Sequence, residues 1–113
     1  TMTVGNLLRH EAGLPDHVHL ASFHTAMAAR ISEGSAAIAP EEAIAFVIGA
    51  DALFPAGAGW AYTDTGYLLL GLVIEKAAGT GYYDLVTNRL LLPNGLNATT
   101  PSDTTTLPGL AVG

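Results

Sequence analysis

The sequence contains no cysteine, which excludes disulfide bonds, zinc–thiolate sites and a cysteine nucleophile. Positive charge is also scarce, because four Lys and Arg residues are set against ten Asp and Glu residues, for a net charge of -6. Proteins that bind nucleic acid neutralise phosphates with clustered Lys and Arg, and no such cluster occurs along the 113 residues. We therefore expect no nucleic-acid partner.

Long apolar runs are missing as well. The longest, residues 67–74 with Gly71 inside it, falls far short of the roughly 20 residues that a membrane span needs. Yet half of the residues are hydrophobic, and the mean hydropathy is +0.38. We expect this apolar surplus to form an interior helix or a face that meets another domain. A face of that kind, left exposed, favours a homo-oligomer.

Helical patterns dominate, and no segment shows the alternation of a strand. The predicted helices cover residues 4–10, 18–31, 40–48, 65–78 and 82–92, and an irregular tail follows over 97–113. Thr3 is expected to cap the first helix and Gly79 to end the fourth. The fourth is apolar around nearly its whole circumference, so we expect it to be the buried central helix. The prediction is an all-α fold, with residues 1–113 forming a single helical domain.

The third helix has a clear start, because Pro40 suits a first turn and two acidic residues follow it near the positive end of the helix dipole. It is expected to carry Ile44, Val47 and Ile48 inward.

Three blocks carry a resemblance to a known family. Residues 7–15, LLRHEAGLP, are similar to a Leu-Leu-x-His-Thr-Ser-Gly-Leu-Pro stretch, and residues 54–75 resemble a block that contains Trp, then Tyr-Ser-Asn, then Gly-Tyr-x-Leu-Leu-Gly. Residues 89–99, RLLLPNGLNAT, resemble a third block. In this order the blocks are typical of the serine β-lactamase and penicillin-binding-protein family. That family includes class C β-lactamases, D-alanyl-D-alanine carboxypeptidases, D-aminopeptidases and esterases. The resemblance implies a helical subdomain of an α+β β-lactamase/transpeptidase-like fold.

The resemblance also implies acyl transfer through an acyl-enzyme, with no metal or organic cofactor. Tyr62 matches the proton-relay tyrosine of the Tyr-x-Asn element and is the candidate catalytic residue. A phenol serves as a base only if a nearby ammonium lowers its pKa from about 10. Trp60 is a candidate at the rim of the substrate cleft. The implied substrate is a β-lactam, a D-amino-acid peptide or an ester, and the sequence leaves these open.

Asp64 stands where the family usually has Asn. An amide donates to a substrate carbonyl, whereas an ionised carboxylate only accepts. Asp64 is therefore a candidate to bind a cationic substrate or a catalytic lysine, or else to cap the helix that follows it.

Two further elements of such an enzyme are absent from the sequence. The single lysine, Lys76, would need a serine three residues earlier to form Ser-x-x-Lys, and that position is Val73. Lys76 does not begin a Lys-Thr-Gly element either. We expect an internal fragment that is inactive alone. The alternative is a non-catalytic helical module that binds a partner or self-associates. Residues 1–4 lack the pattern of a signal peptide, and localisation stays open, although the resembling enzymes are often exported to the periplasm or secreted.

The histidines offer weaker signals. His17, His19 and His24 are close in sequence, but no acidic or cysteine ligand stands at a recognisable spacing, and loop histidines are mostly solvated. No metal site is expected. His10 lies inside the first block and is expected to form structural hydrogen bonds rather than to act as a base.

Overall fold

The computed structural model describes residues 1–34, 38–101 and 109. Within these ranges every regular element is a helix, which agrees with the predicted all-α fold. The α-helices are α1 (Val4–Leu8), α2 (Ala21–Ser32), α3 (Pro40–Ala45), α4 (Asp64–Ala78) and α5 (Tyr82–Val86). A 3₁₀ turn, η1 (His17–His19), precedes α2, and a π-helical turn η2 (Thr87–Leu91) and a 3₁₀ turn η3 (Leu92–Asn94) follow α5. Residues 97–101 form no helix, and most of the predicted tail lies outside the described residues.

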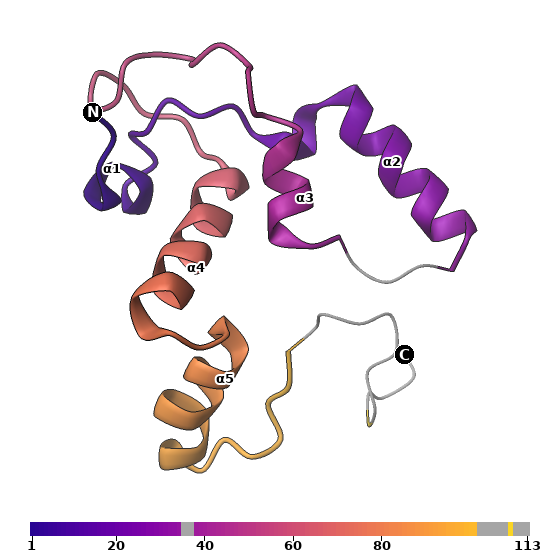
Figure 1. Ribbon diagram of the computed structural model, residues 1–113, viewed down its shortest axis with the longest axis vertical. Coiled ribbons are helices and arrows are strands. Elements are labelled where there is room, and N and C mark those ends of the chain that lie inside the picture. The colour runs from indigo at the N-terminus through magenta and orange to yellow at the C-terminus, as the bar shows by residue number, and fades with distance from the viewer. Residues whose placement is uncertain (35–37, 102–108, 110–113) are drawn as a thin grey trace.

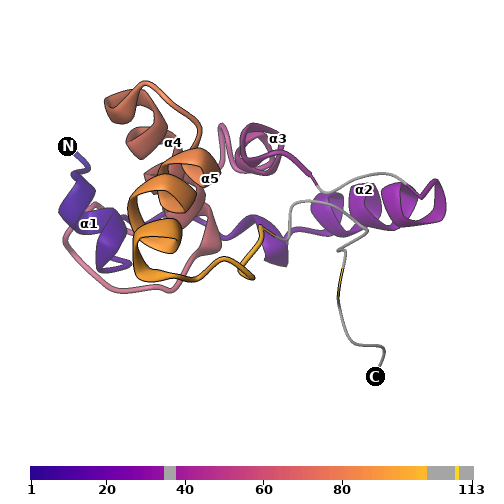
Figure 2. The ribbon, with the colours of Figure 1, turned by 90° about the horizontal axis from the view of Figure 1, so that it is seen from below.

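The longest helix, α4, lies at the centre and contacts α1, α3, α5 and η1 (Figure 1). The apolar core sits between α1 and α4, where Leu7, Ala12 and Leu70 are buried and Leu14 and Leu69 pack against them. In contrast, α2 buries none of its residues and lies beyond α3, on the side away from α4, in both views (Figure 2). The fold is thus a small core around α4 with α2 outside it, and an ion pair at 2.6 Å joins Arg30 of α2 to Glu42 of α3.

The predicted helix ends are confirmed where local chemistry determines them. Thr3 Oγ1 accepts a hydrogen bond from the Asn6 amide at 3.2 Å, and Asn6 Oδ1 accepts from the Thr3 amide at 3.0 Å. This reciprocal capping satisfies amides that a helix start leaves unpaired. At the other end of the core, Gly79 adopts a left-handed φ of 68° and ends α4.

Three expectations about the helices are wrong. The helix that begins at Pro40 stops at Ala45 instead of continuing to 48, and Ile48 is 76% exposed while Ile44 and Val47 are buried. The predicted helix over 82–92 is α-helical only to Val86. Pro93 explains the change, because its ring clashes with the carbonyl four residues earlier, which lies within η2.

The third correction concerns α4 itself. It is central but not buried, since only Thr65, Gly66 and Leu70 of its residues are buried and its outer side carries exposed large apolar side chains. The other described helices therefore cover only part of the apolar surface of α4. No helix in the described ranges is both long and apolar enough to cross a membrane.

Candidate active site

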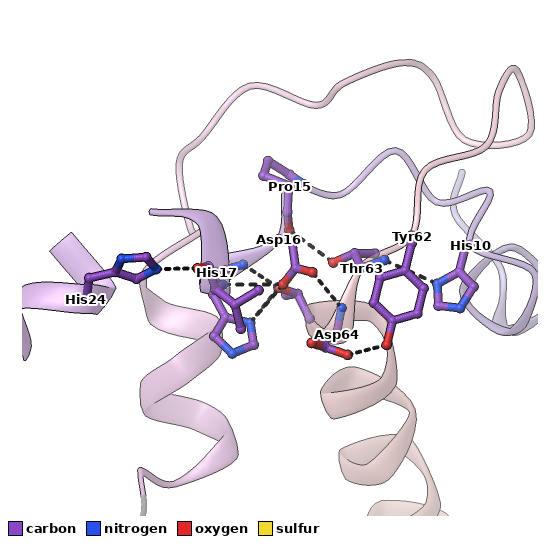
Figure 3. Close-up of polar contacts among 10 residues, drawn as sticks. His10, Pro15, Asp16, His17, His24, Tyr62, Thr63 and Asp64 are labelled. Carbon is purple, nitrogen blue, oxygen red and sulfur yellow. Dashed lines mark hydrogen bonds and ion pairs between the residues drawn. The ribbon is translucent and has the colours of Figure 1, made fainter. Parts of the chain in front are cut away.

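The candidate site lies where the loop before α4 joins that helix. Tyr62 is the second-last residue of the loop, Thr63 is the last, and Asp64 is the first residue of α4. The Tyr62 hydroxyl donates a 2.6 Å hydrogen bond to Asp64 Oδ1, and Figure 3 shows the two side chains directed toward each other. Tyr62 is 58% exposed, and Asp64 is half-buried. The phenol and the carboxylate thus form one unit that faces solvent.

The carboxylate controls the acidity of this phenol. The hydrogen bond to Asp64 and the negative charge of Asp64 raise the pKa of Tyr62 above its ordinary value of 10.0. Asp16 and Tyr67 act in the same direction. Within the described residues, Tyr62 is therefore a neutral donor at physiological pH. Acting as a base would require a cation from elsewhere.

Asp64→Asn is expected to move the pKa of Tyr62 down toward 10, because the amide removes the charge that opposes phenolate formation. Ultraviolet absorbance of the phenolate during an alkaline titration measures this, with a Tyr62→Phe variant identifying the Tyr62 signal. An unchanged titration would show that Asp64 does not set the acidity of Tyr62.

The residues on either side of Asp64 are buried and anchored. Thr63 and Thr65 are 1% and 0% exposed. Thr63 Oγ1 donates to the Pro15 carbonyl at 3.3 Å, and Thr65 Oγ1 accepts from the His17 amide at 3.1 Å. The His17 ring is also 2.9 Å from Thr65 Oγ1. Two buried threonines thus fix the segment on which Tyr62 and Asp64 lie.

Asp16 caps α4 although it lies 48 residues earlier in the chain than Asp64. Its Oδ2 accepts a hydrogen bond from the Asp64 amide at 3.1 Å, and its Oδ1 accepts one from the Val18 amide at 3.4 Å (Figure 3). A carboxylate at this end also interacts favourably with the positive end of the helix dipole. The expectation that Asp64 caps α4 is therefore wrong. Thr63 is the N-cap residue, and the carboxylate that serves the first amide belongs to Asp16.

His10, which lies in the sequence block 7–15, contacts both Thr63 and Tyr62. Its Nδ1 accepts a hydrogen bond from the Thr63 amide at 3.3 Å, which confirms that it forms a structural hydrogen bond. Its ring centroid lies 4.6 Å from that of Tyr62 and 5.1 Å from that of Tyr67, and Trp60 meets it edge-on at 6.2 Å. Trp60 is 68% exposed, beside the Tyr62 segment.

The other histidines have separate roles. His17 is only 5% exposed, so the expectation of a solvated histidine is wrong there, and its neighbour Phe23 meets its ring edge-on at 4.8 Å. His24 Nε2 lies 2.6 Å from the Val18 carbonyl, and His19 is exposed. The described part of the chain contains no group of three or more His, Cys, Asp or Glu side chains placed to hold a metal ion.

Sequence reasoning missed Asp16, His17 and Thr65. Asp16 and His17 lie between the first two predicted helices, and the partner of each lies 48 residues further along the chain. The only available signal was that these residues are polar and adjoin predicted helix starts.

Residues 1–105 match the Beta-lactamase family. The chain belongs to this family. Penicillin-binding protein 4* of Bacillus subtilis (strain 168) is 34% identical over 103 residues, which cover 87% of this chain and 21% of that protein. The match supports the predicted resemblance.

Solved structures give the same result. The D-stereospecific amidohydrolase from Streptomyces sp. superposes with a TM-score of 0.76 at 29% identity, covering 84% of this chain and 28% of that one. The octameric penicillin-binding protein homologue from Pyrococcus abyssi gives 0.65 at 32% identity, covering 85% and 22%. The D-amino acid amidase from Ochrobactrum anthropi SV3 gives 0.60 at 27% identity, covering 83% and 25%. The chain is thus a helical part of the β-lactamase/transpeptidase-like fold, and it spans about a fifth to a quarter of these relatives.

Proposed function

We propose that this chain is the helical subdomain of a serine hydrolase that acts by acyl transfer, with Ser-x-x-Lys and Lys-Thr-Gly supplied from outside residues 1–113. The observation that carries the proposal is the exposed Tyr62–Asp64 pair, which lies in the matched Tyr-x-Asn position and is held by buried contacts on both sides. A group that transfers protons needs such fixed placement together with access to substrate.

In the proposed reaction a serine oxygen attacks the substrate carbonyl carbon, and the bond to the leaving amine breaks. The proton lost by the serine is delivered to that amine, and Tyr62 is the residue proposed to pass it on. Since Asp64 holds the phenol neutral here, the lysine of Ser-x-x-Lys is the cation that would oppose this effect. Water then releases the acyl group and restores the serine.

The proposed substrates are amides or peptides of D-amino acids. Two relatives are a D-stereospecific amidohydrolase and a D-amino acid amidase. The carboxylate of Asp64 supports this choice, because such substrates carry an ammonium group that a carboxylate attracts and an amide does not. Trp60, exposed beside Tyr62, is placed to contact the substrate side chain at the rim. β-Lactams and esters are the other substrates that the family resemblance implies.

The test compares the 113-residue chain with a complete hydrolase that contains it. Each is incubated with a penicillin and, separately, with an activated ester of D-phenylalanine, and its intact mass is measured. We expect an acyl adduct on the complete protein and an unchanged mass for the chain. A stable adduct on the chain would place a nucleophile within it. A complete protein that neither forms an adduct nor hydrolyses D-phenylalanine amide would exclude the hydrolase.

A second function, self-association, is favoured by one observation. A groove of about 800 Å³ follows α4 between α1 and α5 and is lined mainly by apolar side chains, among them Tyr67, Val73 and Ile74, which are 50%, 43% and 37% exposed. Exposed apolar surface on this scale promotes association.

The chain alone is therefore expected to form dimers or larger species in light scattering. Val73→Glu, which puts a charge into the groove, is expected to shift it toward monomer. Ile48→Glu, a substitution at an exposed site that does not line the groove, serves as the matched control. A monomer at high concentration would contradict self-association.

A further inference from the structure

His10 has an unusual backbone conformation. Its φ of 58° is the only positive value among the non-glycine residues that the structure describes. Side chains rarely adopt this left-handed region, although His and Asn are enriched there, and residues held in it cluster at functional sites. Two backbone hydrogen bonds hold it in place: its amide donates to the Leu7 carbonyl at 3.2 Å, and its carbonyl accepts from the Ala61 amide at 3.0 Å.

The His10 ring packs against two tyrosines. It is tilted by 36° against Tyr62 and is stacked on Tyr67 with an interplanar angle of 29°. Tyr67 is fixed in turn, because its hydroxyl donates to the Leu8 carbonyl at 3.2 Å. The imidazole is therefore the surface against which the Tyr62 ring rests, and a movement of His10 would move Tyr62.

The hydrogen bond at Nδ1 depends on the charge of His10. Nδ1 accepts from the Thr63 amide, which requires a neutral ring with its proton on Nε2. A second proton converts Nδ1 into a donor, and two donors would then face each other at 3.3 Å. The ring or the Thr63 segment must then move. Because Thr63 lies between Tyr62 and Asp64, the pair moves with it.

We propose that His10 is a positioning residue for Tyr62, and that proton uptake at Nδ1 disconnects the Thr63 segment and displaces the tyrosine. The inference rests on the proposed function, since it assigns the active form of that site to neutral His10. Activity is then lost when Nδ1 of His10 takes up a proton.

Two tyrosines face His10, Tyr62 from the loop before α4 and Tyr67 from α4. On its own segment, Arg9 and Glu11 bond to each other at 2.9 Å. Of the nearby carboxylates, Asp64 accepts from the Tyr62 hydroxyl and Asp16 accepts from the Asp64 amide.

The test uses His10→Asn and His10→Ala. Asn tolerates the left-handed backbone, and its side-chain oxygen accepts a hydrogen bond but takes up no proton. His19→Asn, at an exposed histidine, is the matched control. The amide resonance of Thr63 is followed by NMR against pH in the chain, and kcat/KM against pH in the complete hydrolase.

In the wild type we expect the Thr63 amide to titrate together with the His10 ring, and kcat/KM to fall on the acid side. His10→Asn is expected to abolish both pH effects and to keep a higher kcat/KM at neutral pH than His10→Ala, because its side-chain oxygen still accepts from the Thr63 amide. His10→Ala is expected to lower kcat/KM at neutral pH by roughly 10- to 100-fold, as misplaced catalytic groups do.

The inference would be overturned if the Thr63 amide resonance did not change when His10 takes up a proton, or if the loss of kcat/KM at acidic pH persisted in His10→Asn. Either result would leave the proposed hydrolase function unaffected. If the complete protein shows no acyl transfer, the proposed function fails. The NMR titration alone then decides whether His10 positions Tyr62.

Discussion

Tyr62→Phe is expected to lower kcat/KM for acyl transfer by the complete hydrolase about 10²- to 10⁴-fold, the usual contribution of a positioned proton-transfer group. The substitution removes only the hydroxyl, whose described partner is Asp64. Because the ring is 58% exposed and remains beside His10, folding should be unaffected. Steady-state kinetics with a D-amino-acid amide measure the effect, and circular dichroism checks the fold.

Tyr67→Phe is the matched control for this result. Tyr67 is 50% exposed and also packs against His10, but its hydroxyl binds the Leu8 carbonyl instead of Asp64. Its loss should change kcat/KM by no more than a few-fold. Equal losses in the two variants would show that the aromatic cluster, and not the Tyr62 hydroxyl, supports activity.

Gly13→Ala is expected to destabilise the chain by about 3–5 kcal/mol, through left-handed strain together with overpacking. Gly13 has a φ of 73°, and a Cβ there would lie 2.0 Å from the carbonyl oxygen of Phe54. That atom is backbone and cannot rotate away. Urea unfolding followed by circular dichroism gives the free energy.

Gly49→Ala separates the two causes. Gly49 has a φ of 85°, but a Cβ there would meet nothing within 4 Å. It should cost only the backbone strain, about 1–2 kcal/mol. If both variants lose the same stability, the close approach of Gly13 to Phe54 is not a constraint on the fold.

Local signals in the sequence predicted the elements well. A threonine before α1 and a glycine after α4 mark helix ends through hydrogen bonds within a few residues, and both were predicted. The exposure of α4 was not predicted, because periodicity reports which residues are apolar and not what covers them. The turns of η2 depend on how Pro93 disturbs the preceding carbonyls, which a helical period cannot show.

In the candidate site, too, the sequence predicted what local motifs determine and missed what long-range contacts determine. Tyr62 and Asp64 were selected because they occupy the first and third positions of one three-residue motif. The contacts that hold them involve Asp16 and His17, which meet α4 across 48 residues of chain. Such pairings depend on how the chain returns on itself, and no residue spacing encodes that path.

The exposure of α2 has a consequence for how this family can vary. The chain leaves the site after η1, passes through a helix none of whose residues is buried, and has returned to the site by Tyr62. The cost of closing such an excursion grows slowly, by about 0.6 kcal/mol for each doubling of its length. Insertions and deletions in α2 should therefore be tolerated, so that relatives can differ in size there while the tyrosine keeps its place.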